Sequence, residues 1–204
     1  MQGTSRLRIT AIVVGIVAAG AFTAQAHAGV LAKSTFDTDA DGWKVVGDTS
    51  SGTETATHVP TGGDPGGFIS IDDAATGGVM YWRAPKTFRK AAEDAYKGSL
   101  AFSLRQSVTS NQFDADDIVI EAPGLTLVYN TSPNPAIAPG WTTYKVPLTK
   151  AGWTDATVSP EPATAKDMKD ALKAAGSLLI RAEYQTGPDI DDLDSVTLKS
   201  EPKN

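Results

Sequence analysis

The sequence of 204 residues contains no cysteine, two histidines and three methionines. Without cysteine there are no disulfide bonds and no cysteine nucleophile, so the fold must be held by packing, to which a bound ion could add. A zinc site usually takes several His or Cys ligands at short spacing, and beyond the N-terminal region the chain offers only His58. No serine has the G-x-S-x-G pattern of a hydrolase nucleophile either.

Long hydrophobic runs are also missing, except at the N-terminus. There two arginines precede an apolar run at residues 9–22, and small residues follow. This pattern predicts a secretory signal peptide at residues 1–28, cleaved after Ala26 or Ala28. A membrane anchor is disfavoured because the run is shorter than the roughly 20 residues that a spanning helix needs. We therefore expect a secreted protein, extracellular or periplasmic, with no membrane span after cleavage.

Clusters of basic residues are absent too. The formal net charge is −6, and it becomes −8 without the signal peptide, which holds two arginines and no acid. An acidic chain without a basic stripe is not expected to bind nucleic acid. The remaining length, about 175 residues, fits one domain. We place a spacer at residues 29–33, the domain at 34–200 and a tail at 201–204.

Short alternating or β-branched runs between Gly, Pro, Asp and Ser clusters make up most of the chain after residue 34. In the run 98–107, for example, Leu100, Phe102 and Leu104 fall on one face. Turn signals recur about every 10–15 residues, which is typical of a β-sandwich or barrel. The expected strands lie within residues 66–72, 77–85, 98–107, 116–130 (two strands), 140–148, 176–185 and 191–200.

Two stretches have a helical composition instead. Residues 85–98 are expected to form one or two turns over one end of the sandwich. Residues 162–176 predict a longer helix, with Thr164 as N-cap and Asp167 favouring the N-terminus. We interpret both as surface packing elements.

The stretch "FDTDADGWKVVGD" (36–48) has the acidic spacing of half an EF-hand calcium loop, with Asp37, Asp39 and Asp41. A calcium sensor is disfavoured because no helix flanks the loop and position twelve is Asp rather than Glu. We interpret "FDTDADGW" (36–43) as the opening strand of the sandwich, with Phe36 and Trp43 packed inward and Asp39 and Asp41 in a solvated turn.

A second acidic stretch, "GPDIDDLDSVTL", lies near the C-terminus, and Asp194 is its last acidic residue. First and last strands of a sandwich are often neighbours, and acids brought together there repel unless they are solvated or bridged by a cation. Calcium takes six to eight oxygen ligands and would suit the position. Both alternatives, an ion or two solvated turns, remain open.

Four tryptophans are candidates for core or surface roles. Trp43 and Trp82 are flanked by strand residues and are expected in the core. Trp141 and Trp153 each follow a glycine near a turn, so these two are the candidates for exposed rings that stack on sugars. A carboxylate-dependent glycoside hydrolase is a remote alternative, for which Glu54, Glu121 and Glu183 are the available glutamates in strands.

Several segments together resemble a known family. "YWRAPKTF", "YKGSLAFSLRQ" and "LKAAGSLLIRAEYQ" are similar to the laminin B domain, also called laminin domain IV, in an exported bacterial form. The resemblance covers about residues 34–199. It implies a jelly-roll β-sandwich like those of galactose-binding and carbohydrate-binding modules, in an extracellular, non-enzymatic role. It also implies a structural calcium ion held by Asp37 and Asp194, completed by backbone carbonyls near "GGDPGG".

These observations predict an exported, non-catalytic binding module whose partner is a glycan or polysaccharide of the cell envelope. Trp141 and Trp153 are the expected ligand-binding residues, and calcium is the expected ion. The alternative is a structural or protein-interaction module of the envelope without affinity for sugars.

Overall fold

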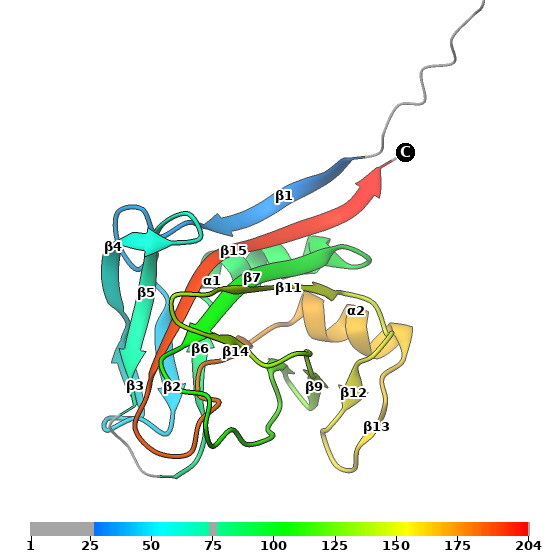
Figure 1. Cartoon of the computed structure of the whole chain (residues 1–204). Coiled ribbons are helices and arrows are strands. Elements are labelled where there is room, and N and C mark those ends of the chain that lie inside the picture. Colours follow the sequence, from blue (N-terminus) through cyan, green and yellow to red (C-terminus); the bar gives the residue numbers. More distant parts are fainter. Residues whose placement is uncertain (1–26, 74–76, 204) are drawn as a thin grey trace, which may run out of the picture.

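The computed structural model describes residues 27–73 and 77–203, so most of the predicted signal peptide lies outside the described residues. Two mainly antiparallel β-sheets pack face to face, and short helices cover one end of the sandwich (Figure 1). A single large core fills the space between the sheets, with members from both of them, such as Phe102 and Ile180. The predicted all-β jelly-roll sandwich is confirmed.

The seven-stranded sheet is organised around the long C-terminal strand β15. The first half of β15 pairs with β5 and its second half with β1, while β7 runs along its other side. Strands β11 and β10 extend the sheet beyond β7, and β4 extends it beyond β5. The members are β1 (His27–Ser34), β4 (Thr57–Gly63), β5 (Gly66–Asp72), β7 (Ser99–Gln106), β10 (Ala136–Ile137), β11 (Thr142–Pro147) and β15 (Ile190–Lys203).

The eight-stranded sheet has the order β13-β12-β9-β8-β14-β6-β2-β3. Its central strands are apolar on the face toward the core, as Ile118, Ile120 and Ile180 illustrate, each with 0% exposure. The members are β2 (Lys44–Gly47), β3 (Thr53–Thr55), β6 (Met80–Arg83), β8 (Ile118–Ala122), β9 (Leu125–Tyr129), β12 (Thr154–Asp155), β13 (Glu161–Pro162) and β14 (Ser177–Arg181).

The helices lie where the sequence predicts them. Helix α1 (Lys86–Ala91) continues into the 3₁₀ turn η1 (Ala92–Ala95), and α2 (Ala165–Lys173) is the longer helix. Thr164 and Asp167 form a complete capping box at the start of α2, which satisfies two backbone N–H groups that the helix leaves unpaired. Within the described residues, no helix is long and apolar enough to cross a membrane.

The predicted domain limits need correction at both ends. Strand β1 pairs antiparallel with β15 from His27, opposite Lys203, to Ser34, opposite Val196. Residues 29–33 therefore belong to the sheet rather than to a spacer, and residues 201–203 extend β15 rather than forming a tail. Neither stretch alternates strongly in sequence, and the pairing of the two chain ends with each other is a non-local contact that local sequence does not signal.

The segment 36–43 is not the opening strand that we expected. It turns between β1 and β2, because Phe36 and Asp41 adopt left-handed backbone conformations with φ of 52° and 49°. The inward packing of Phe36 and Trp43 is confirmed, with 0% exposure for both and their rings 6.4 Å apart. Asp39 is exposed and accepts a hydrogen bond from the Asp41 N–H, which agrees with the predicted solvated turn.

Candidate functional site

The outer face of the seven-stranded sheet carries a row of polar side chains across its central strands. Leu104 of β7 points into the core, so its neighbour Arg105 points outward. Arg105 pairs in register with Asp192 of β15, and Asp192 pairs with Ser70 of β5. Trp141 lies at the β11 end of this row, just before Thr142, whose register partner is Leu104. Below, the term outer face refers to the part of this surface formed by five residues: Phe68, Ser70, Arg105, Trp141 and Asp192.

The guanidinium group of Arg105 is enclosed by two aromatic rings. Its central carbon lies 4.2 Å from the Trp141 ring centroid and 4.5 Å from that of Phe68. Its Nε donates to Asp192 at 2.7 Å, and its Nη1 donates to the Gly62 carbonyl at 3.0 Å. Phe68 is buried beneath this arrangement, whereas Trp141 stays partly exposed. The outer face thus presents an indole fixed in orientation by a charged neighbour.

Trp153 has a different environment, and the expectation that it is an exposed ligand-binding ring is wrong. Its side chain is 2% exposed and packs on Tyr129 with ring centroids 5.4 Å apart. Its indole N–H donates to the Pro147 carbonyl at 2.8 Å. The preceding Gly152, with a φ of 78°, lies against the Tyr129 ring, where a side chain would clash. The turn therefore directs the indole into the core rather than toward solvent.

The turn between β4 and β5 brings the predicted ion ligands into one neighbourhood. A side chain at Gly66 would place its Cβ 2.5 Å from the Asp37 Oδ1, and one at Gly63 would place its Cβ 2.6 Å from the Asp194 Oδ2. Both acids therefore pack against the same short turn, from β15 and from the segment after β1. Only glycine permits so close an approach on both sides.

Asp64, at the tip of this turn, is a third acid that sequence reasoning did not single out. Its carboxylate accepts from Ser103 Oγ at 2.9 Å, and its carbonyl accepts from Ser195 Oγ at 2.6 Å. The turn is thereby tied to the outward-facing residues of β7 and to β15. The sequence did offer one signal for Asp64: it lies between two pairs of glycines in "GGDPGG", a pattern typical of a tight turn.

Asp194 is fully buried, and its carboxylate accepts hydrogen bonds from the backbone N–H groups of Asp64 and Ser195. Burial nevertheless raises the pKa of Asp194 to about 6, and the charges of Asp64 and Asp37 contribute to the rise. Within residues 27–73 and 77–203, none of these three acids forms an ion pair with Lys or Arg.

This oxygen-rich turn suits calcium in donor chemistry, since all the groups offered are oxygens. In the described part of the chain, however, no three His, Cys, Asp or Glu side chains form a metal-binding group by themselves. Asp37 and Asp194 would hold an ion here only with backbone carbonyls or water as the remaining ligands. The Asp64 carbonyl lies in the same turn and is a ready candidate.

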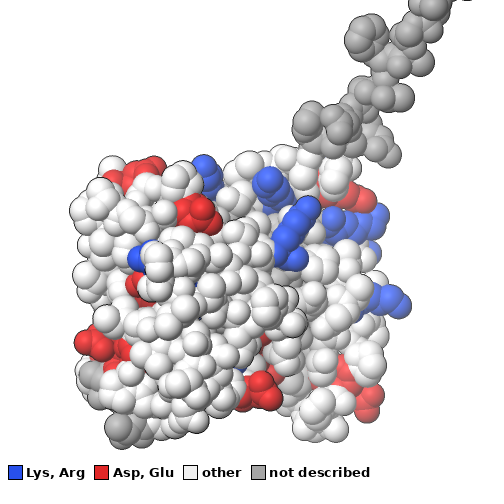
Figure 2. Space-filling model, viewed as in Figure 1, with Lys and Arg blue, Asp and Glu red and all other residues white. Residues whose placement is uncertain are grey.

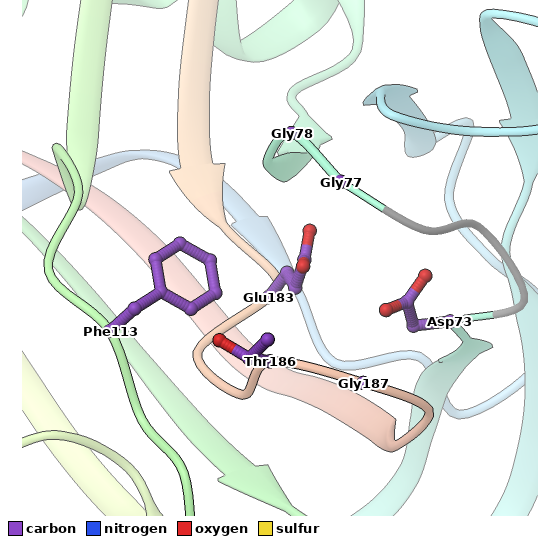
Figure 3. Close-up of a pocket in the computed structure, with 7 residues that line it drawn as sticks. All are labelled: Asp73, Gly77, Gly78, Phe113, Glu183, Thr186 and Gly187. Atoms are coloured by element: carbon purple, nitrogen blue, oxygen red, sulfur yellow. The ribbon is translucent and has the colours of Figure 1, made fainter.

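A second acidic region surrounds a cavity of about 430 Å³ at one end of the sandwich. Its lining includes Asp73, Glu183, Phe113 and Thr186, together with glycines that expose backbone (Gly77, Gly78 and Gly187). Figure 3 shows Phe113 and Asp73 on opposite sides of the cavity, with Glu183 and Thr186 between them. The Glu183 carboxylate accepts from the Met80 N–H at 3.0 Å. Burial raises the pKa of Glu183 to about 6.

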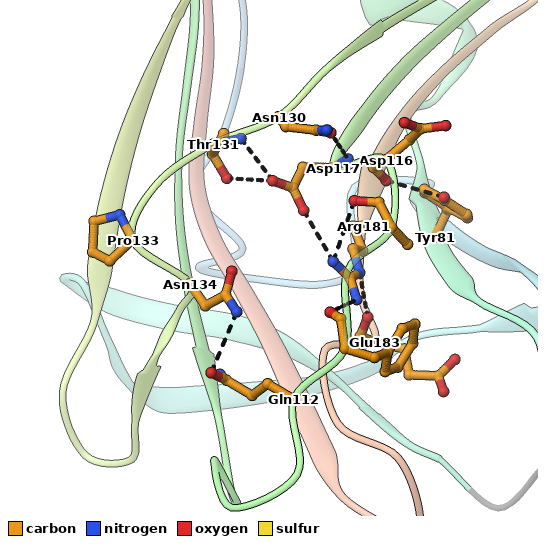
Figure 4. A network of polar contacts seen from close by, with 12 residues as sticks. Tyr81, Gln112, Asp116, Asp117, Asn130, Thr131, Pro133, Asn134, Arg181 and Glu183 are labelled. Carbon is orange, nitrogen blue, oxygen red and sulfur yellow. Dashed lines mark hydrogen bonds and ion pairs between the residues drawn. The ribbon is translucent and has the colours of Figure 1, made fainter. Parts of the chain in front are cut away.

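Arg181 lies next to this cavity but is bound on its other side. It is 1% exposed, and it donates to the Glu183 carbonyl at 2.6 Å and to the Phe113 carbonyl at 2.7 Å. An ion pair at 3.3 Å joins it to Asp117, which in turn accepts from Thr131 (Figure 4). Arg181 thus connects the 113–117 segment to the end of β14.

The charges on the remaining surface are unevenly distributed. Figure 2 shows a mostly uncharged face, with lysines gathered at the end where the described termini lie. Lys97, Lys145 and Lys199 line one hollow at that end. The acids form separate patches around the edges of this face.

The three glutamates considered for glycoside hydrolysis are not assembled into one site. Glu54 lies on β3 and Glu121 on β8, and three strands of the sheet separate the two. Glu183 lies beyond the end of β14, where its neighbour at the cavity is Asp73. The geometry of the sheet therefore offers no pairing of these glutamates.

Two packed sheets, a long C-terminal strand and short covering helices define the chain as a jelly-roll β-sandwich domain. The L4b domain of human laminin alpha-2 has a similar fold, with a TM-score of 0.64 and 17% sequence identity, covering 86% of this chain and 100% of that one. Residues 81–203 match the family model of Laminin B (Domain IV). Because the match spans more than half of the sequence, the chain belongs to the Laminin B (Domain IV) family, as the sequence predicted.

A more distant similarity is to the family 11 carbohydrate-binding module of the Clostridium thermocellum cellulosomal cellulase Lic26A-Cel5E. The TM-score is 0.49 and the identity 12%, over 86% of this chain and 99% of the module. A search of curated proteins finds no match to the sequence.

Proposed function

We propose that the chain is a secreted, non-catalytic module that binds a glycan on the outer face, with one structural calcium ion near Asp37 and Asp194. Its export follows from the N-terminal pattern of basic, apolar and small residues. The observation that carries glycan binding is the partly exposed indole of Trp141, held against Arg105 above a polar row of the sheet.

The chemistry of this row suits a sugar. One face of a pyranose ring carries C–H groups, whose slightly positive edges favour the electron-rich face of an indole. Sugar hydroxyls need donors and acceptors beside that ring, and the partly exposed Ser70 and the exposed Thr143 carry hydroxyl groups on this side of the sheet. Because Trp141 is fixed by Arg105, little side-chain freedom would be lost on binding.

The proposed ion and the proposed glycan site are physically linked. Gly62 of β4 directly precedes the β4–β5 turn that packs on Asp37 and Asp194, and its carbonyl accepts from Arg105. The same turn accepts hydrogen bonds from Ser103 and Thr143 through Asp64. An ion that fastens this turn would therefore also fix the position of Arg105 and, through it, of Trp141.

A polysaccharide pull-down and a glycan array test the proposal. The wild-type protein should retain at least one envelope polysaccharide, and Trp141→Ala should abolish retention while leaving the circular dichroism spectrum unchanged. Tyr81→Ala is the matched control, since it removes a partly exposed aromatic ring from the other sheet. This control should bind like the wild type.

No binding by the wild type to any glycan, in the presence of calcium, would reject the proposal. Binding that Trp141→Ala leaves unchanged would reject the outer face as the site. In the first case the alternative, a structural or protein-interaction module of the envelope, would become the preferred interpretation.

A further inference from the structure

A hollow of about 500 Å³ lies between helix α1 and the C-terminal end of α2, and its walls are basic. Four cations line it: Lys86, Arg89, Lys90 and Lys173. Glu93 is the one acid among the described lining residues, so the formal charge around the hollow is 4 − 1 = +3. This concentration occurs in a chain whose net charge is −6. Grouped charges of one sign along a concave wall focus their field into the concavity.

These four cations are not neutralised by acids of the chain. In the part of the chain that the structure describes, no ion pair involves any of them. Glu93 borders the same hollow, but it forms no ion pair with them among the described residues. Lys86, Lys90 and Lys173 are exposed to solvent, and Arg89 is partly exposed. Their charge is therefore available to an anion that enters the hollow.

The ends of the two helices explain only part of this arrangement. Arg89 and Lys90 lie in the last turn of α1, and Lys173 lies in the last turn of α2. Cations are stabilised there by the partial negative charge of a helix C-terminus. Lys86, however, is the first residue of α1, where the helix dipole does not favour a cation. The dipoles also give no reason for the cations of two helices to line one hollow.

A second observation comes from the hydrogen bonds of Arg89. Its Nη1 donates to the Gly176 carbonyl at 2.5 Å, which holds the guanidinium group beside the end of α2. Its Nε is enclosed by protein and has no acceptor, and its Nη2 has no acceptor among the described residues either. Buried polar groups are almost always paired. Nε and Nη2 lie on one edge of the guanidinium group, and such an edge can donate to two oxygens of a single oxyanion.

The charge and the walls of the hollow favour a phosphate ester over a carboxylate. A phosphate monoester carries about −1.5 to −2 charge at neutral pH and three strong acceptor oxygens, which suits a two-donor guanidinium edge surrounded by lysines. A space of about 500 Å³ is within the range of small-molecule sites, so it admits a phosphate group together with the group that it esterifies. No aromatic side chain is among the described lining residues, so a small polar organic part fits best.

From these contacts we infer that the hollow between α1 and α2 binds the phosphate group of a small phosphate ester, either a glycerol phosphate or a sugar phosphate. The unpaired edge of Arg89 donates to two phosphate oxygens. Lys90 and Lys173 donate to the phosphate from the two helices, and Lys86 adds positive charge at the rim. This site is separate from the outer face and depends on neither the proposed glycan nor the proposed calcium ion.

Isothermal titration calorimetry of the purified chain at low ionic strength tests the site with matched probes. Glycerol 3-phosphate is compared with glycerol, and glucose 6-phosphate with glucose and with glucuronate. At least one phosphate ester should bind with a Kd of about 1 mM or tighter, the range expected for ligands of this size. Its uncharged partner and glucuronate should bind at least about tenfold more weakly. Whichever ester binds more tightly identifies the organic part, and inorganic phosphate should bind no more tightly than that ester.

Nuclear magnetic resonance locates the binding without any substitution. The backbone amides of Ala174 and Ala175, which line the hollow, should shift when the better ester is titrated into the wild-type chain. The indole N–H of Trp141 on the outer face should not shift. The shifts of the two alanine amides should weaken as salt is added, because the Debye length falls from about 30 Å at 0.01 M to about 10 Å at 0.1 M ionic strength.

Two variants test the roles of the cations. Arg89→Lys keeps the charge but loses the two-donor edge, so the ester should bind about tenfold more weakly. The double variant Lys90→Gln/Lys173→Gln should also weaken binding by about tenfold or more. Lys145→Gln/Lys150→Gln removes the same charge from two exposed lysines outside the hollow and should bind like the wild type. The melting temperature of each variant checks that it is folded.

Four results would overturn the inference. The first is that neither phosphate ester binds the wild-type chain, and the second is that glucuronate binds as tightly as glucose 6-phosphate or inorganic phosphate more tightly than both esters. The third is that an ester binds without moving the amides of Ala174 and Ala175. The fourth is that the double variant Lys90→Gln/Lys173→Gln binds as well as its charge-matched control, because the affinity would then come from the general charge of the surface.

Discussion

Arg105 and Trp141 stack with 4.2 Å between the guanidinium carbon and the indole centroid, although Arg105 lies on β7 and Trp141 directly precedes β11. The same Arg105 forms an ion pair at 2.7 Å with Asp192, and both side chains are largely buried, with 12% and 9% exposure. Solvent screens the attraction between two such buried charges only weakly. If one partner is removed, the other remains as an uncompensated buried charge, which destabilises the fold.

We therefore expect Arg105→Met to lower the free energy of unfolding by about 2–4 kcal/mol, because Asp192 would remain buried without its counter-charge. Urea denaturation of the two proteins measures the difference. In the double variant Arg105→Met/Asp192→Leu the unpaired charge is gone, so part of the loss should be recovered. A double variant less stable than Arg105→Met would contradict this account.

Trp141 and Trp153 should respond very differently to truncation. Trp153→Ala removes a 2%-exposed ring and its hydrogen bond to Pro147, so we expect a loss of about 3–5 kcal/mol in unfolding free energy. Trp141→Ala removes a partly exposed ring and should cost about 1 kcal/mol. Thermal unfolding followed by circular dichroism compares the two, and equal losses would contradict the burial difference.

The two tryptophans also show the limit of reading this chain from its sequence. Both follow a glycine near a turn, and nothing local distinguishes them. Their fates depend on partners distant in sequence: Tyr129 and the Pro147 carbonyl around Trp153, and Arg105 and Phe68 around Trp141. Alternation and turn residues, which are local signals, predicted the long strands such as β7, β8 and β15, but not β1, β3 or β4.

The acidic residues illustrate the same distinction. The pairing of Asp37 with Asp194 follows from the family resemblance and from the expected neighbourhood of the first and last strands, whereas the turn against which both pack is a third segment, residues 63–66. Glu183 and Asp73 belong to strand ends 110 residues apart in number, and no sequence pattern places them at one cavity. Strand register decides such encounters, and a single sequence does not specify it.

Arg181 should be one of the least replaceable residues of the chain. It is 1% exposed and makes hydrogen bonds to Asp117 and to three carbonyls. Arg181→Met would leave Asp117 buried at 3% exposure without its cation, so we expect a loss of about 3–5 kcal/mol. Lysine cannot reproduce the forked donor geometry, and Arg181→Lys should recover only a minor part. Chemical denaturation of both variants tests this; a full rescue by lysine would contradict the geometric role.

The stability of the calcium-free chain should decrease as the pH rises from about 4 to about 7.5. Burial raises the pKa of Asp189 to about 7 and those of Glu183 and Asp194 to about 6. The folded state therefore binds protons more tightly than the unfolded state, and the stabilisation is present at low pH and is lost as the pH passes these raised values.

Melting temperatures in EGTA across this pH range measure the effect, which should amount to at least about 1 kcal/mol because each pKa unit corresponds to about 1.4 kcal/mol. Asp189→Asn removes one titrating group and should flatten the decrease. A melting temperature that rises steadily from pH 4 to 7.5 would show that the acids are not raised in pKa.

Removal of calcium should lower the melting temperature at neutral pH if Asp37 and Asp194 share an ion. With calcium at about 100 times its Kd, the expected stabilisation is about 2.7 kcal/mol, which corresponds to about 5–10 °C for a domain of this size. Differential scanning calorimetry with calcium and with EGTA measures the shift. Elemental analysis of the purified chain gives the stoichiometry independently.

Asp37→Asn is the informative variant, because Asp37 is exposed and its carboxylate bonds only to Thr35 among the described residues. It should reduce the calcium-dependent shift strongly while leaving the melting temperature in EGTA nearly unchanged. Asp41→Asn, in the same loop and equally exposed, is the matched control and should keep the full shift. Asp194→Asn should lower the melting temperature in both conditions, because Asp194 also accepts two backbone hydrogen bonds. A wild-type chain that shows no calcium-dependent shift and contains no metal would reject the ion at this turn.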